Sequence, residues 1–234
     1  MTSAIRDPIP PAWVARPACL SGRDQTPLLR GWIHAGAAVA ALPAGAALVD
    51  RAAGTGSAAF VALYACALVV LFSVSASYHL MPVSSRTRHW LRRADHATIY
   101  IFIGACYTPY CGLVVRGELG SIVLGLVWAG ALAGVAVKLA RFESLGPVAG
   151  ILYLGLGWLA LVTVPEAVAR LSFLDVGLLV GMGLTYTAGA AVLALRRPDP
   201  FPRVFGYHEV WHTLVVLAGA CYFAIVWTMM AAPR

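Results

Sequence analysis

Charged side chains are scarce in this sequence, and those present are gathered in short stretches. Only 12% of the 234 residues are Asp, Glu, Lys or Arg, whereas 60% are hydrophobic, and the mean hydropathy is +0.79. A soluble domain of this length distributes charge along its whole surface. The composition therefore excludes an ordinary soluble globular protein and predicts one compact integral membrane domain.

Several common motifs are absent as well. The five cysteines show no C-x-x-C spacing and four of them fall in apolar stretches, which argues against a disulfide framework or a cysteine metal site. The sequence has no glycine-rich phosphate loop, nucleotide-binding fingerprint or internal repeat. No module that reads RNA or DNA accompanies the net charge of +7, so we expect no nucleic-acid partner.

Long apolar stretches account for most of the chain. There are seven of them, at residues 32–50, 58–80, 96–115, 119–139, 146–164, 176–195 and 206–230. Each approaches the roughly 20 residues that a helix needs to cross roughly 30 Å of hydrocarbon, and none alternates like a strand of an outer-membrane barrel. The sequence thus predicts an all-α membrane protein with seven transmembrane helices, formed by residues 30–234.

Residues 1–29 differ from the rest of the chain. They are rich in proline and lack the apolar core of a signal peptide. We therefore expect a disordered cytoplasmic tail rather than a cleaved export signal.

The positions of the basic residues predict the orientation in the membrane. With seven spans, the two termini face opposite sides and the loops form two alternating sets. Thirteen of the 17 lysines and arginines lie in the set that includes the amino-terminal tail. By the positive-inside rule, the amino terminus is cytoplasmic and the carboxyl terminus is outside. We expect a multi-pass protein of the cell (inner) membrane whose Arg86–Arg93 segment contacts anionic lipid head groups.

Ionisable residues at the ends of three spans form the candidate site. His79 closes the second span, Asp95 opens the third, and His208 and His212 lie at the start of the seventh. The predicted topology places all four at the same cytoplasmic depth, although the count of basic residues did not use them. Ionisable side chains inside a membrane are functional candidates by default.

The spacing of these residues favours a metal site. His208 and His212 are four residues apart and share a helix face, as do Ser75 and His79. Three imidazoles match the ligand count of a catalytic zinc site. We therefore predict that His79, His208 and His212 bind Zn²⁺. The alternative is that each histidine reaches the membrane interface or a neighbouring helix without a metal.

Two further side chains are candidate catalytic residues. Asp95 can serve as a fourth ligand or as a general base toward a metal-bound water, and we favour the second role. Ser75 lies one turn deeper than His79 on the same face, where it can hold the water or polarise a substrate carbonyl. A hydroxyl at this place can equally bond to its own helix carbonyl.

The remaining polar residues of these segments carry weaker predictions. His34, at the cytoplasmic end of the first span, is a second-tier candidate, and His89 is expected on a loop surface among arginines. Residues 208–212 match the protease signature H-E-x-x-H, but residues 213–234 hold no third ligand. Glu209 is therefore interpreted as an interfacial residue in the first turn of its helix.

Three segments in combination closely resemble the hemolysin III family, the bacterial branch of the progestin and adipoQ receptor superfamily. They are Ser75–His79, Asp95–Tyr100 running into Tyr107–Pro109, and the His208–His212 pair. The resemblance extends from about residue 31 to 230 and implies a seven-helix protein with its amino terminus inside. It also implies a zinc ion held by the three histidines, with Asp95 at the zinc-bound water and Ser75 close by. The chain departs from the family where Arg30-Gly31-Trp32 replaces an acidic, Asn-containing approach to His34.

Three functions remain open at this point. The superfamily is considered related to alkaline ceramidases, so the resemblance implies a zinc-dependent hydrolase of a lipid amide or ester. A receptor or regulator with structural zinc is the second possibility. The third is a cytolysin, after the activity that gave the family its name, although no span shows the strong amphipathic face of a pore lining.

Overall fold

The computed structural model describes residues 26–140 and 146–231, and within them the protein is all-helical. Seven helical stretches are long and apolar enough to cross a membrane, as predicted. The elements are α1 (Trp32–Ala52), α2 (Ala58–Leu80), α3 (Ser85–Tyr110), η2 (Cys111–Val115), α4 (Gly117–Ala140), α5 (Gly146–Trp158), η3 (Leu159–Thr163), α6 (Val164–Arg170), α7 (Phe173–Leu195) and α8 (Tyr207–Ala231). The chain is therefore a multi-pass membrane protein.

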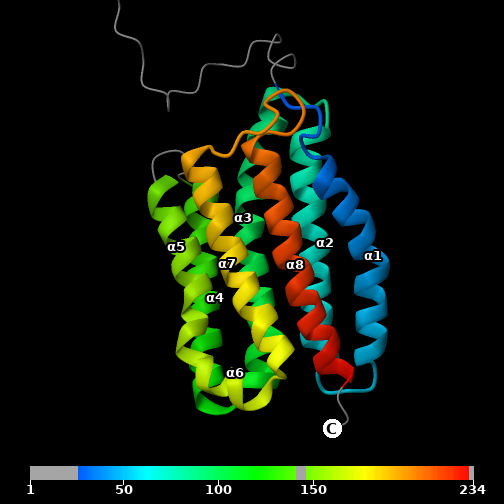
Figure 1. Cartoon of the computed structure of the whole chain (residues 1–234), viewed down its shortest axis with the longest axis vertical. Coiled ribbons are helices and arrows are strands. Elements are labelled where there is room, and N and C mark those ends of the chain that lie inside the picture. Colours follow the sequence, from blue (N-terminus) through cyan, green and yellow to red (C-terminus); the bar gives the residue numbers. More distant parts are fainter. Residues whose placement is uncertain (1–25, 141–145, 232–234) are drawn as a thin grey trace, which may run out of the picture.

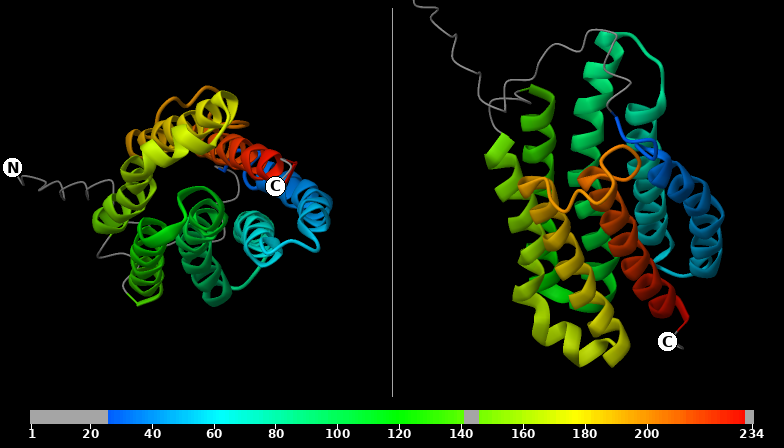
Figure 2. Two further views of the ribbon diagram at one scale, coloured as in Figure 1. Left: turned by 90° about the horizontal axis from the view of Figure 1, so that it is seen from below. Right: turned by 45° about the horizontal axis from the view of Figure 1, so that its top comes forward.

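The helices form a closed ring when the bundle is viewed along its length (Figure 2). Helices α1 to α5 follow one another around the ring, and α7 and α8 complete it, so that α8 packs between α7 and α1. The largest buried cluster joins α1, α2, α3 and α8, and includes Leu48, Tyr64, Phe102 and Ile225. This closure brings the first two helices of the chain next to the last one.

The two ends of the bundle carry different connections (Figure 1). The start of α1, the α2–α3 turn and the α7–α8 loop lie at one end, which we call the histidine end because His79 and His208 lie there. The α1–α2 loop, α6 and the end of α8 lie at the other. The common depth predicted for the histidines is thus confirmed, while the side of the membrane that this end faces stays a prediction.

Helix α3 begins eleven residues before the predicted third span. The Ser84 hydroxyl caps it by accepting a hydrogen bond from the Thr87 backbone N–H at 3.2 Å. The basic segment therefore forms helical turns, and the expectation that His89 lies on a loop is wrong, although its side chain is exposed. Asp95 lies in the third turn of α3 rather than at its start. Hydropathy does not detect these turns, because their charged side chains make this part of the helix polar.

The fifth span is also longer than the sequence predicted. It runs from α5 through the 3₁₀ segment η3 into α6, and ends at Arg170 instead of residue 164. The buried Thr163 hydroxyl at the junction forms a hydrogen bond of 2.8 Å with the Tyr110 hydroxyl of α3. This contact fixes the irregular segment against the bundle.

The residues just before α1 contact the α7–α8 loop. The backbone N–H groups of Leu28 and Leu29 donate to the carbonyls of Arg203 and Val204 at 3.0 and 3.1 Å. Residues 1–25 of the expected tail lie outside the described residues. The segment that leads into α1 is therefore hydrogen-bonded to the loop that leads into α8.

Candidate metal centre and its cavity

Three histidines from two helices meet at the histidine end. His79 comes from the last turn of α2, while His208 and His212 come from the first turns of α8. The Nε2 atoms of His79 and His208 are 3.4 Å apart, and one ring nitrogen from each of the three histidines lies within 4.8 Å of the others. Residues separated by 129 positions in the sequence thus converge on one point.

The cluster fits a divalent cation. Ring nitrogens bound at about 2.0–2.1 Å in a tetrahedral arrangement lie roughly 3.3 Å from one another. The 3.4 Å between His79 and His208 matches this spacing, and the third ring lies with its centroid 4.6 Å from that of His208. His212 is 3% exposed, so its imidazole is withdrawn from solvent. The three residues can therefore hold a metal ion of the kind that prefers nitrogen ligands.

A glycine allows α1 to pass close to this cluster. Gly31 precedes α1 with φ of 84°, a left-handed conformation that favours glycine. A Cβ atom at this position would lie 2.7 Å from the Cβ atom of His79. The Arg30-Gly31-Trp32 segment, which the resemblance did not explain, therefore packs directly on one of the histidines.

Asp95 and Ser75 line the same cavity as His208 and His212. Ser75 is 2% exposed, and its side chain lies next to the Asp95 carboxyl group. The Nδ1 atom of His96 lies 3.7 Å from Asp95 Oδ2 and 2.9 Å from the Arg92 carbonyl oxygen. A carboxyl group and a hydroxyl group are thus held together beside the candidate ligands.

His34 belongs to the centre, a position that the sequence could only suggest. Its ring is stacked on that of His212, with centroids 3.9 Å apart and planes 3° from parallel. His34 is 4% exposed, and neither of its ring nitrogens has a hydrogen-bond partner among the described residues. The face-to-face contact fixes the plane of the His212 imidazole. The sequence indicated His34 only through its predicted depth in the membrane, which is the same as that of the other histidines.

Glu209 does not take part in the centre, despite the H-E-x-x-H spacing. Its carboxylate accepts a hydrogen bond from the Gly206 N–H at 2.8 Å and forms an ion pair with Arg30. The side chain is 1% exposed, so the expectation of an interfacial residue is wrong. Because consecutive helix residues point in different directions, Glu209 faces the start of α1 while its neighbour His208 faces the cavity. It caps α8 and ties that helix to the segment before α1.

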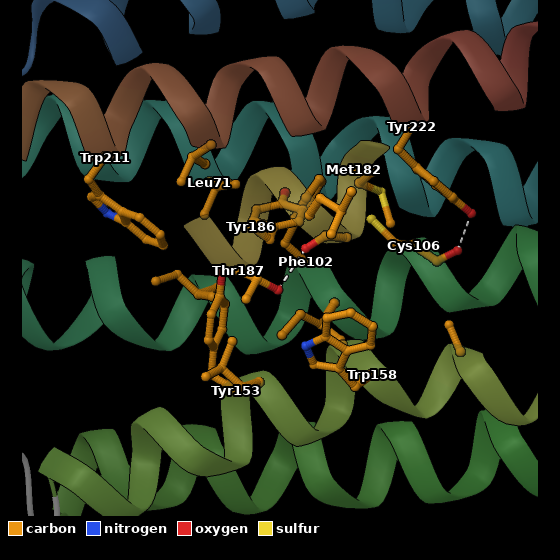
Figure 3. A pocket seen from close by; sticks show the side chains of 18 of the residues that line it. Leu71, Phe102, Cys106, Tyr153, Trp158, Met182, Tyr186, Thr187, Trp211 and Tyr222 are labelled. Atoms are coloured by element: carbon orange, nitrogen blue, oxygen red, sulfur yellow. Dashed lines mark hydrogen bonds between the residues drawn. The ribbon is translucent and has the colours of Figure 1, made fainter. Parts of the chain in front are cut away.

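An apolar cavity of about 310 Å³ extends from the histidines into the bundle. Figure 3 shows its wall, where Leu71, Phe102, Met182 and Trp211 surround the space between the helices. Ser75, Asp95, His208 and His212 contribute polar groups at its histidine end. This combination of an apolar chamber and a few convergent polar groups is typical of a small-molecule site.

The cavity reaches the outer surface of the bundle between the fifth span and α7. Leu161, Val180 and Leu184 line it, yet each is more than half exposed. These residues lie within spans, so the opening faces the hydrocarbon region of a membrane.

Comparison with known proteins assigns the family. A family model described as "Haemolysin-III related" matches residues 23–223. Hemolysin-3 of Bacillus cereus is 26% identical over 82% of this chain and 86% of its own length. The hemolysin-3 homolog of Bacillus subtilis is 28% identical over 70% of this chain and 74% of its own. The human monocyte to macrophage differentiation factor is 28% identical over 70% and 68%, respectively. Since the family model covers most of the residues that form the bundle and the histidine cluster, this chain belongs to the haemolysin-III-related family.

Proposed function

We propose that the protein is a metal-dependent hydrolase of a lipid amide or ester bond. The observation that carries this proposal is a cluster of three histidines, two of which, His208 and His212, line the end of an apolar cavity together with Asp95 and Ser75. A structural metal site alone has no need of a carboxyl and a hydroxyl group aimed into a chamber. Zn²⁺ is the ion we expect, since imidazole ligands suit it and the count of three leaves a coordination position open.

The cavity supports a lipid as substrate. Its wall is apolar, and it opens toward the hydrocarbon beside Leu161 and Val180. An acyl chain placed in it would bring the first polar group of the lipid to the histidine end. We place this end on the cytoplasmic side of the cell membrane, because the basic residues concentrate in the loops that flank it.

The chain's own residues supply the proton transfers. The bound cation would polarise the carbonyl oxygen of the substrate and favour ionisation of water. Asp95 takes a proton from the attacking water and delivers it to the leaving amine or alcohol as the carbon–nitrogen or carbon–oxygen bond breaks. Ser75, next to Asp95 in the cavity, helps to position the Asp95 carboxyl group. The products are a fatty acid and an amine or alcohol.

The experiment is a lipid hydrolysis assay on the purified protein, together with metal analysis. Wild type should contain about one divalent ion per chain and release fatty acid from amide or ester lipids. Asp95→Asn should keep the metal and lose at least two orders of magnitude in rate, as expected for a general base. Asp50→Asn, at an exposed carboxylate of α1, is the control and should behave as wild type. Equal rates for wild type and Asp95→Asn would refute the proposed base.

Ser75 has a matched control two residues away. The Ser77 hydroxyl donates its only O–H to the Ser73 carbonyl of its own helix at 2.7 Å. Ser75→Ala should therefore slow hydrolysis while Ser77→Ala should not. A metal that stabilises the fold with no hydrolysis of any lipid would instead favour a receptor or regulator. Leakage of liposomes that is unaffected by Asp95→Asn would favour the cytolytic activity that the names of the Bacillus relatives suggest.

A further inference from the structure

Two tyrosine hydroxyls in the wall of the cavity have no hydrogen-bond partner among the described residues. They belong to Tyr153 of α5 and Tyr186 of α7, and both oxygen atoms are buried. Other buried tyrosines of the bundle do have partners: the Tyr107 hydroxyl donates to the Leu156 carbonyl at 2.9 Å, and that of Tyr222 donates to the Cys106 carbonyl. The two unpaired phenols are thus exceptions within their own protein.

Tyr153 and Tyr186 are neighbours on the wall. Their ring centroids are 6.5 Å apart at an interplanar angle of 83°, and Tyr153 lies 6.3 Å from the Trp211 ring. Figure 3 shows both rings reaching from their helices into the space that Leu71 and Trp211 also border. These two phenols, which we call the polar spot, stand in a mainly apolar part of the chamber, where the neighbouring Thr187 hydroxyl already donates to the Gly183 carbonyl.

A buried hydroxyl without a partner destabilises a protein, so tyrosine is expected at such a place only where its O–H finds a partner. Phenylalanine would fill the same volume without that cost. Two tyrosines side by side suggest that the occupant of the cavity supplies the missing oxygen or nitrogen atom.

The packing of α7 against α8 gives the depth of this polar spot. A Cβ atom at Gly189 would touch the Trp211 ring at 2.8 Å and the Leu214 Cβ at 3.5 Å, so Gly189 is level with the turn that contains His212. Tyr186 precedes Gly189 by three residues on a helix that runs toward the histidine end, so its backbone lies roughly 4.5 Å deeper at 1.5 Å per residue. This corresponds to a few bonds of an acyl chain.

We propose that the lipid bound in this cavity carries a hydroxyl or carbonyl oxygen on its chain, a few bonds from the group held at the histidines. Tyr153 and Tyr186 bind this oxygen and select substituted chains over plain ones. A site built around such hydrogen bonds discriminates strongly against analogues that lack the polar group. The inference rests on the lipid occupant of the proposed function and not on its hydrolysis.

The test is a competition binding assay with free fatty acids, which the enzyme cannot hydrolyse. Palmitic acid and 3-hydroxypalmitic acid compete with a fluorescent fatty acid for the purified full-length protein in nanodiscs. Wild type should bind the 3-hydroxy acid about tenfold more tightly, as expected for one or two hydrogen bonds formed in an apolar site. A palmitic acid that carries its hydroxyl at the far end of the chain should bind no more tightly than palmitic acid itself.

Variants connect this preference to the two phenols. The double substitution Tyr153→Phe and Tyr186→Phe should bind both acids equally and should still bind palmitic acid. Tyr107→Phe is the matched control, because its hydroxyl also borders the cavity but already donates within the protein. It should keep the preference.

Two outcomes would overturn the inference: equal affinity of wild type for the two acids, or a preference that survives in the double variant. Equal affinity would mean that the phenols bind only water. Hydrolysis of lipids without a preference for the 3-hydroxy acid would refute this inference but not the proposed function. A preference for the 3-hydroxy acid without hydrolysis of any lipid would support the role of the two tyrosines and refute the proposed hydrolase.

Discussion

The buried carboxylate of Glu209 offers a sharp test, because two readings of the same residue predict opposite results. If the H-E-x-x-H spacing were functional, Glu209 would be a general base and its loss would abolish hydrolysis without affecting the fold. In the structure it caps α8 through the Gly206 N–H and pairs with Arg30 instead. We therefore expect Glu209→Ala to act on stability.

The magnitude follows from the two interactions. Loss of the cap costs about 1 kcal/mol, and loss of the hydrogen bond between the buried carboxylate and the half-buried Arg30 costs about 2 kcal/mol. The free energy of unfolding should thus fall by about 3 kcal/mol, which corresponds to roughly 6–12 °C in Tm for a chain of this size. Glu209→Gln retains an acceptor for the Gly206 N–H and should lose less. Because His208 is the next residue, metal affinity should fall as the first turn of α8 loosens.

Thermal unfolding of the purified protein measures the first effect, and metal titration measures the second. A double-mutant cycle with Arg30→Ala should give a coupling energy of about 1–3 kcal/mol, since the two residues are in direct contact. The hydrolysis rate per folded, metal-loaded molecule should stay close to that of wild type. A variant of wild-type stability that has lost all activity would refute this assignment and restore Glu209 as a base.

Three further predictions concern the histidine cluster. His34→Ala should weaken metal binding by roughly two- to tenfold in a titration, whereas His34→Phe should preserve it, since an aromatic stack contributes about 0.5–1.5 kcal/mol; equal weakening by both would show that His34 acts through its nitrogens. Gly31→Ala should lower both Tm and metal affinity because it adds at least about 1 kcal/mol of backbone strain and a contact with His79, while Gly36→Ala, which meets nothing within 4 Å, should not. Removal of metal by a chelator should lower Tm, and an excess of Zn²⁺ at about 100 times its Kd should restore about 2.7 kcal/mol; an unchanged Tm would argue against any bound ion.

The sequence predicted the parts of this protein that depend on period and depth. The seven apolar stretches predicted the seven membrane-spanning helices. Because successive loops lie on alternate sides of the membrane, the sequence also predicted that His79 and His208 lie at the same end of the bundle. These predictions succeed because a bilayer fixes both the length of a span and the level of its ends. In a soluble protein, nothing comparable fixes the length of a helix or the level of its ends.

What the sequence could not predict depends on side-chain directions across the ring. His34 and His212 lie on α1 and α8, and only the closure of the ring brings their faces together. The burial of Glu209 likewise depends on Arg30 approaching from the other end of the sequence. The early start of α3 was missed for another reason: the prediction used hydropathy alone, which does not register a cap such as that of Ser84.

The pairing of α2 and α8 across the closed ring has a consequence for biosynthesis. Helices emerge from the ribosome in chain order, so α2 enters the membrane long before α8 has been translated. His79 therefore lacks the other two histidines of the cluster until α8 packs beside α1. Chains that lack α8 hold a single histidine of the cluster, so the centre can assemble only after α8 has been translated.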